Sequence, residues 1–458
     1  MGSRKRSMKL QITVAAFVAV MVVVGVMGCA PKANEGNPTP VGKAPTVVPV
    51  DQKNKFGLIG TEAWKDQYPD QYTSYFENEK NEWPEEDGNR NARCPEMVTL
   101  GKGYGYAKFF YDAGGHTSSM YTVTHNGRVG EKTKAQCLAC KTPDISEMVA
   151  QQGESAWKSN FFEVAEQCED GITCAMCHEN ENPSALRIER ADWKRALGDN
   201  ADKRHLSSEV CGQCHCDYSM NATTGEPTSP YDDVTTMTPE NALKWYDEHG
   251  YVDWTYPETG AKMIAVRHSE FEYTNGGMGN HMVQLGYDCA DCHMAVKTNA
   301  DGEAYHSHYW TSPLQNEELI KNDCSKCHAD LKSEMKAIME KYDDAIHQNG
   351  MRNASFVQNF VKAVQAGTLT DEQLERLRTI QRESTFYWNS AYAENSNGCH
   401  NPALFDEVLA KSEALLDEGD QILGEESSPD KFVSEYDPSK DYQLEETSEE
   451  YYAKHDQR

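Results

Sequence analysis

Five pairs of cysteines, each pair separated by two residues, constrain this chain more than any other feature. Four pairs are followed directly by histidine, whereas the first is followed by Lys141. The C-x-x-C-H pattern is typical of haem c attachment, in which two thiols bond to the haem and the next residue ligates iron. Four such patterns in one chain do not arise by chance. The ten cysteines are Cys137, Cys140, Cys174, Cys177, Cys211, Cys214, Cys289, Cys292, Cys324 and Cys327.

The composition agrees with a core that is built partly from cofactors. Only 38% of the 458 residues are hydrophobic, which is low for a large globular protein. Each haem is a large apolar body that replaces part of a side-chain core. We therefore predict a mainly α fold, a multihaem cytochrome c with a haem-packed core, few short strands and long C-terminal helices.

The N-terminus has the features of a targeting segment. Basic residues are followed by an apolar run from Leu10 to about Met27, and Gly28 precedes Cys29. We expect residues 1–28 to be a signal peptide of lipoprotein type, with Cys29 lipidated and the protein tethered at the periplasmic face. A plain signal peptide and an uncleaved anchor helix are the alternatives. All three place the remaining chain outside the cytoplasm.

The rest of the chain divides into four regions by composition. Residues 29–55 are rich in Pro, Gly and Asn and indicate a flexible linker. Residues 56–328 hold the five cysteine motifs and form the expected pentahaem catalytic region. Residues 329–424 have the apolar spacing of long helices, and we expect dimerisation there, although the stripes could instead be buried within the chain. Residues 425–458 form an acidic tail that is extended or disordered.

Four helices are predicted between residues 329 and 424. Gly350 is interpreted as the stop of the first helix, and Gly419 as the end of the last. A capping box of Thr370 and Gln373 starts the third, and Pro402 starts the fourth. The predicted helices cover residues 329–349, 353–366, about 370–393, and 402–418.

The charge of the chain limits its partners. With 44 basic and 73 acidic residues the formal net charge is −29, which argues against nucleic acid and against anionic partners in general. An anionic substrate would need local positive charge. Besides Cys29, four cysteines lie outside the motifs and are free thiols or disulfide-bonded: Cys94, Cys168, Cys216 and Cys399.

The residue available as an axial iron ligand distinguishes the first motif from the others. A haem that only transfers electrons needs two strong axial ligands, and eleven histidines lie outside the motifs. The motif histidines that supply the proximal ligands are His178, His215, His293 and His328. Lys141 stands where a proximal ligand always lies, so we interpret its neutral amine as an iron ligand with an open site opposite. Alternatively, a histidine from elsewhere ligates and Lys141 is a surface amine.

One C-x-x-C-K motif followed by four C-x-x-C-H motifs resembles the pentahaem cytochrome c nitrite reductases, the ammonia-forming family. The resemblance extends from about residue 56 to 425. It implies five haem c groups and the six-electron reduction of nitrite to ammonium. It also implies an electron donor, either a membrane tetrahaem quinol dehydrogenase or a soluble multihaem protein.

The resemblance also assigns individual residues. It implies that Arg128, Tyr218 and His268 form the distal side of the active site. Arg128 and His268 would bind nitrite, His268 would donate protons, and Tyr218 would order water or assist proton steps. The distal ligands implied for the second to fifth haems are His308, for which His306 is an alternative, His116, His400 and His281.

The chain departs from the common family pattern beside the active site. Many members bind calcium through a glutamate before the tyrosine and a Lys-x-Gln before the histidine. Here these positions hold Asp217, Ala265 and Arg267. The chain therefore resembles the calcium-independent branch, with Arg267 in place of the ion. The alternative is that Arg267 faces solvent and calcium binds through Asp217.

Two other functions are compatible with the motifs. A pure electron conduit would have every haem ligated twice by protein, and only the lysine motif argues against it. The same enzyme could also act mainly on sulfite, hydroxylamine or nitric oxide.

Overall fold

The computed structural model describes most of the chain between residues 43 and 440. The predicted signal peptide, the lipidation of Cys29 and most of the acidic tail lie outside the described residues. The described ranges are 43–80, 90–104, 116–125, 127–203 and 206–440.

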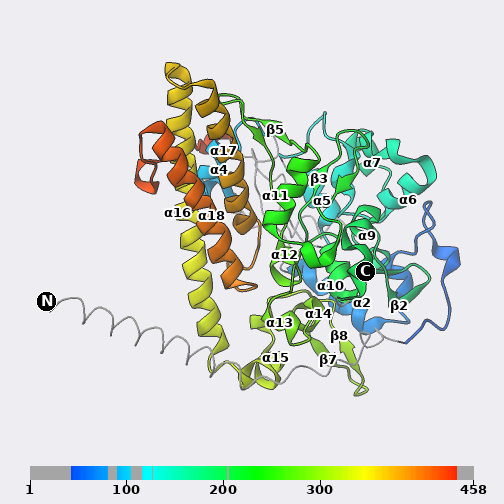
Figure 1. Cartoon of the computed structure of the whole chain (residues 1–458). Coiled ribbons are helices and arrows are strands. Elements are labelled where there is room, and N and C mark those ends of the chain that lie inside the picture. The colour runs from blue at the N-terminus through cyan, green and yellow to red at the C-terminus, as the bar shows by residue number, and fades with distance from the viewer. Residues whose placement is uncertain (1–42, 81–89, 105–115, 126, 204–205, 441–458) are drawn as a thin grey trace, which may run out of the picture.

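The first two thirds of the described chain form short helices joined by loops (Figure 1). Most are one or two turns long, because Gly, Pro and the cysteine motifs interrupt the apolar spacing. These helices are α2 (Pro69–Phe76), α3 (Arg90–Arg93), α4 (Glu96–Leu100), α5 (Ser119–Thr124), α6 (Asp144–Gln152), α7 (Phe161–Ala165), α8 (Cys174–Cys177), α9 (Ala191–Leu197), α10 (Leu206–Gly212), α11 (Pro239–Glu248), α12 (Glu270–Thr274), α13 (His281–Gln284), α14 (Cys289–His293) and α15 (Glu317–Asn322).

The strands in the described chain form two-stranded antiparallel sheets, each made by consecutive strands. They are short and widely separated, and none of these sheets forms a layer of its own. The few-strand, mainly α prediction is therefore confirmed. The pairs are β1 (His178–Glu179) with β2 (Asn182–Leu186), β3 (Ser219–Met220) with β4 (Pro227–Thr228), β5 (Trp254–Thr255) with β6 (Lys262–Met263), and β7 (Val296–Thr298) with β8 (Ala304–His306).

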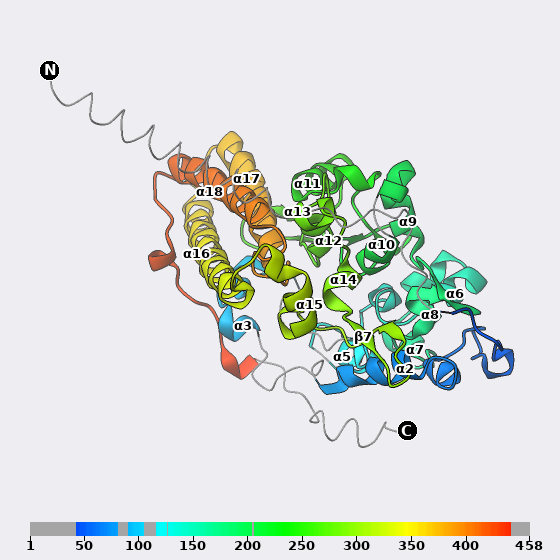
Figure 2. The same cartoon turned by 90° about the horizontal axis from the view of Figure 1, so that it is seen from below.

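Three long helices stand side by side along one side of the molecule (Figures 1 and 2). They are α16 (Leu331–Ala366), α17 (Asp371–Tyr392) and α18 (Pro402–Leu423). The predicted capping box is present at the start of α17. α16 and α18 end at Gly367 and Gly424, which both adopt left-handed conformations that glycine tolerates without strain.

The predicted ends at Gly350 and Gly419 are wrong. Gly350 lies inside α16, which is a single helix of 36 residues, and Gly419 lies inside α18. A Cβ atom at Gly350 would lie 2.7 Å from Nε1 of Trp388, and one at Gly419 would overlap the ring of Phe356. Both glycines therefore allow close contact between helices, which a single sequence does not distinguish from a helix stop.

The apolar stripes of the three helices are largely used within the chain. Buried side chains from all three meet in one core, among them Phe356, Ile380 and Leu416. At the other end of α16, Leu331 and Met335 line the large cavity described below. Burial within the chain, the alternative to dimerisation, therefore accounts for much of the stripe. None of the helices in the described part of the chain combines the length and the apolar character needed to cross a membrane.

Replacing Gly419 with alanine should destabilise the helical region. The new methyl group would overlap the buried ring of Phe356, and overpacking of this kind costs about 1–3 kcal/mol. We expect a lower midpoint of thermal unfolding by circular dichroism. Gly130→Ala is the matched control, because a Cβ there meets no atom within 4 Å. A variant as stable as the parent would show that α18 does not need this close approach.

Candidate haem cavity and active site

A single continuous cavity of about 2400 Å³ runs through the short-helix region and reaches α16. All ten motif cysteines line it, together with Lys141 and the four motif histidines. Pockets for one small ligand measure about 300–1,000 Å³, so this cavity has room for several large ligands. Paired thiols beside an apolar space are the donor set that covalent haem c requires.

Three motif histidines each face a second imidazole. The ring centroids lie 6.0 Å apart for His178 and His308, 6.1 Å for His293 and His400, and 6.5 Å for His116 and His215. Two metal–nitrogen bonds of about 2 Å, added to the two ring radii, give about 6 Å. The spacing of all three pairs therefore fits one metal ion between the rings.

The fifth motif also has a nearby imidazole. Burial lowers the pKa of His281, and the neighbouring His328 lowers it further, so these rings lie within electrostatic reach of each other. The choice between His306 and His308 also has a geometric basis. His308 is the ring that faces His178, while Nδ1 of His306 is 3.0 Å from the carbonyl of Met294.

The Nδ1 atoms of several cavity histidines meet oxygen acceptors. Nδ1 of His293 lies 2.9 Å from the carbonyl of Thr311, and Nδ1 of His328 lies 2.6 Å from the carboxylate of Glu334. His400 makes a similar contact with buried Glu394. An Nδ1–H that donates to oxygen leaves Nε2 deprotonated, which is the form that binds a metal.

The first, third and fourth motifs meet through their cysteines. The thiol of Cys214 is close enough to that of Cys140 to lower its pKa, and the thiol of Cys289 is close enough to that of Cys211 to raise its pKa. Cofactors attached to these motifs would therefore be close neighbours. The hydroxyl of Ser119 donates a hydrogen bond to the backbone carbonyl of Lys141 at 2.9 Å, which fixes the backbone at the first motif.

Arg128, Tyr218 and His268 line the same cavity as Lys141. Lys141 and His268 both lie within electrostatic reach of Cys140. The structure thus brings together residues that are up to 140 positions apart in the sequence, from Arg128 to His268.

Glu270 is a functional residue that the sequence reasoning missed. Its Oε1 lies 3.7 Å from Nδ1 of both His215 and His268. Burial opposes ionisation of Glu270, but the two neighbouring histidines hold the pKa of its carboxyl well below the ordinary value. The carboxylate therefore lies next to both the motif histidine and the distal histidine. The only sequence signal was its position two residues after His268.

Arg267 is buried behind Tyr218. Its side chain is 4% exposed and forms an ion pair with Asp253, with Nη2 2.9 Å from Oδ1. Nη1 donates to the carbonyl of Tyr218 at 2.6 Å, and Nη2 to the hydroxyl of Tyr104 at 2.9 Å. The alternative in which Arg267 faces solvent is therefore wrong.

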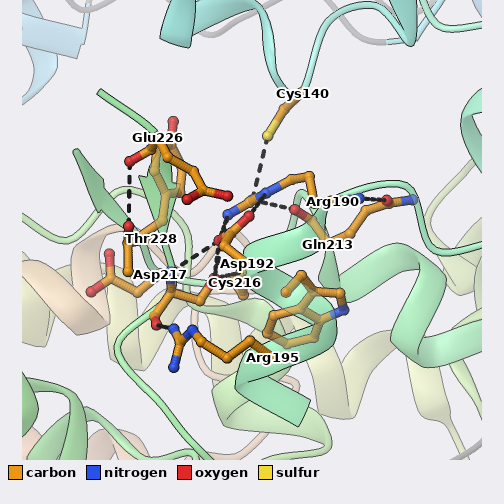
Figure 3. A network of polar contacts seen from close by, with 12 residues as sticks. Cys140, Arg190, Asp192, Arg195, Gln213, Cys216, Asp217, Glu226 and Thr228 are labelled. Atoms are coloured by element: carbon orange, nitrogen blue, oxygen red, sulfur yellow. Dashed lines mark hydrogen bonds and ion pairs between the residues drawn. The ribbon is translucent and has the colours of Figure 1, made fainter. Parts of the chain in front are cut away.

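A second arginine, Arg190, forms a network of polar contacts with Asp192, Gln213 and Cys140 (Figure 3). Its guanidinium is buried and binds both carboxylate oxygens of Asp192. It also donates to the carbonyl of Gln213 and contacts Sγ of Cys140 at 3.7 Å. The centres of the Arg190 and Arg267 guanidinium groups are each 5.3 Å from the ring centroid of Tyr218. Two cations near one ring restrict its position.

Two buried acids lie next to this network. Burial raises the pKa of Asp217 to about 7 and that of Glu272 to about 8. Tyr246 donates to Asp217 at 3.1 Å, and Tyr231 donates to Glu272 at 2.7 Å. The backbone N–H of Asp217 also donates to Glu272 at 2.8 Å. The carboxyl of Glu272 is therefore largely protonated at neutral pH.

The raised pKa of Glu272 predicts a pH-dependent loss of stability. Because its pKa rises from about 4 in the unfolded chain to about 8 in the folded one, its contribution is complete below pH 4. It is lost as pH rises through 8. Glu272→Gln should lose less thermal stability than the parent between pH 5 and 9. Exposed Glu166→Gln is the control, and equal pH profiles for parent and Glu272→Gln would contradict the prediction.

Comparison with known proteins agrees with the cavity. A family model described as cytochrome c552 matches residues 60–454. A cytochrome c nitrite reductase subunit NrfA of Nitratidesulfovibrio vulgaris is 28% identical over 412 residues, covering 78% of this chain and 76% of that protein. A cytochrome c-552 of Bacteroides fragilis is 27% identical over 370 residues, covering 76% and 73%.

A solved structure has the same fold. The cytochrome c nitrite reductase catalytic subunit of Desulfovibrio desulfuricans superposes with a TM-score of 0.69 at 23% identity. The match covers 86% of this chain and 89% of that one. The catalytic subunit of Desulfovibrio desulfuricans has two calcium sites.

Proposed function

Because this chain belongs to the cytochrome c552 family, we propose that it reduces nitrite to ammonium outside the cytoplasm, using five covalently attached haem c groups. One observation carries the proposal. The lysine of the first motif shares a cavity with Arg128, Tyr218 and His268, whereas the histidine of each other motif has a second imidazole nearby. One motif is thus equipped for a substrate and four for electron transfer.

Haem bound by Cys137, Cys140 and Lys141 would supply electrons and an iron able to bind the substrate. The protein must supply the rest. Nitrite is an anion and the chain carries a net charge of −29, so binding needs local cations. The guanidinium of Arg128 and the imidazole of His268 face the same cavity and can hydrogen-bond the nitrite oxygens.

The reaction consumes six electrons and eight protons and releases two waters with each ammonium. In the proposal His268 delivers protons as the nitrogen–oxygen bonds break, because imidazole titrates near neutral pH. Glu270, 3.7 Å from Nδ1 of His268, places a carboxylate beside the ring. Arg190 and Arg267 hold Tyr218 in place, where its hydroxyl can order water.

The remaining predicted features belong to the same proposal. Residues 56–328 form the pentahaem catalytic region and 329–424 the helical region, through whose outer faces a homodimer would form. Lipidation of Cys29 and a linker over 29–55 would tether the enzyme near a membrane tetrahaem quinol dehydrogenase. A soluble multihaem protein is the other donor class.

Product analysis tests the proposal. With a reduced dye as the electron source, the enzyme should convert nitrite to ammonium. Nitrite should also shift the spectrum of one haem that is not ligated twice by protein. A protein whose haems are all ligated twice, and which forms no ammonium, would instead be an electron conduit. A higher kcat/KM for sulfite or hydroxylamine than for nitrite would reassign the main substrate.

His268→Asn should lower nitrite turnover by about 10²–10⁴-fold, the usual effect of removing a general acid. Five haems should remain attached, because His268 is not one of the proposed axial ligands. His249→Asn is the matched control, since this exposed histidine stacks on Trp245 outside the cavity. Turnover within a few-fold of the parent would remove His268 from the proposed mechanism.

We further propose that Arg267 replaces the calcium ion of many relatives. Its buried guanidinium supplies positive charge to Asp253, and its backbone N–H donates to Asp217 at 3.1 Å. Protein treated with a calcium chelator should therefore keep its activity, and elemental analysis should find no stoichiometric calcium. Calcium bound one-to-one, with activity lost on its removal, would contradict this.

A further inference from the structure

A second cluster of ligand-type side chains lies away from the haem cavity, where the segment before α4 packs against α16. Cys94, Glu96 and His347 offer donor atoms that all lie within 4.8 Å of one another. None of these three residues lines the haem cavity. The roles proposed above for the haem and nitrite sites use none of them.

The helical repeat of α16 adds a fourth donor to the cluster. Asp343 lies one turn before His347, so the two side chains share a face of the helix. Oδ1 of Asp343 is 4.0 Å from Nε2 of His347, and Sγ of Cys94 is 3.9 Å from the same nitrogen. Glu96 contacts the other ring nitrogen, with Oε1 3.0 Å from Nδ1. The imidazole is thus oriented by a carboxylate and directs Nε2 toward a thiol and a second carboxylate.

Burial and charge indicate that a cation belongs in this cluster. Glu96 is fully buried, and its Oε2 has no hydrogen-bond partner among the described residues. Cys94 is 6% exposed. Because Glu96 and Cys94 are both buried, ionisation of the thiol would place two buried negative charges beside one imidazole. Such charges are unfavourable unless they are paired or bind a metal.

We propose that Cys94, His347 and Asp343 bind a zinc ion, with Glu96 holding the imidazole in the tautomer that frees Nε2. Tetrahedral bonds of about 2.0 Å to nitrogen and about 2.3 Å to sulfur place donor atoms about 3.5 Å apart. The distances to Nε2 of His347, 3.9 Å from Cys94 and 4.0 Å from Asp343, are close to this value. A thiolate with imidazole and carboxylate favours zinc over calcium or magnesium. A carboxylate on the far nitrogen is the usual partner of a zinc-binding histidine.

The exposure of the ligands agrees with a metal entering from solvent. The side chain of Asp343 is 61% exposed and that of His347 is 26% exposed, whereas Cys94 and Glu96 lie beneath them. Cys94, His347 and Glu96 also resemble the thiol, base and orienting acid of a nucleophilic cysteine site. A thiol that is 6% exposed is, however, poorly placed to attack a substrate. Zinc would join the segment around α4 to the long helix α16.

Elemental analysis of the haem-loaded protein tests the site. After equilibration with zinc and gel filtration, we expect about one zinc for every five irons. Cys94→Ser and His347→Gln should each reduce the zinc at least tenfold while the iron content is unchanged. Cys168→Ser and His249→Gln are matched controls and should keep it. X-ray absorption should show one zinc–sulfur bond of about 2.3 Å.

A conservative variant guards against misfolding of the buried cysteine variant. Glu96→Gln keeps the shape of the side chain but removes its charge, and should weaken zinc binding by about 10–100-fold. The proposal is overturned if zinc stays below a tenth of an equivalent, or if its amount is the same in the parent and all variants. Labelling of Cys94 by iodoacetamide at a rate that zinc does not change would also overturn it.

Discussion

The separation between facing imidazole rings is the constraint on which the rest of the structure depends. A metal that joins two imidazoles fixes their centroids about 6 Å apart, and three motif histidines in the described chain have a second imidazole at that spacing. The paired residues come from distant parts of the chain, as with His178 and His308. The loops and short helices between them must therefore close around a common space. This explains why the first two thirds of the described chain consist of short helices and loops around one large cavity.

Charge is distributed around that cavity in a way that the net charge of −29 would not suggest. Arg190 and Arg267 are both buried beside Tyr218, and each is paired with an aspartate. Glu270 contacts the two histidines His215 and His268. These pairs keep charged groups in fixed places near the first motif, where an anion could be held. The buried carboxyl of Glu272 is protonated near neutral pH, because burial raises its pKa to about 8.

The long helices show how far the periodicity of a sequence can be interpreted. The capping box at Thr370 and Gln373 was predicted from local spacing and is present, because capping depends only on neighbouring residues. Gly350 and Gly419 were predicted to end helices but lie inside them. Each lies against a bulky ring, Trp388 or Phe356, from another helix. A helix stop and a close helix contact both require glycine, and only the neighbouring helix distinguishes them.

The sequence by itself determined the haem motifs, the lysine in the first motif, the mainly α class and the position of the long helices. These features depend on spacing along the chain, which a sequence records directly. Local spacing does not distinguish among the eleven histidines outside the motifs, and only the tertiary structure shows which of them lie opposite a motif histidine. It also decided that Arg267 is buried, that Glu270 joins two histidines, and that Cys94 meets His347. Such contacts arise between residues that are far apart in the chain, and local spacing carries no information about them.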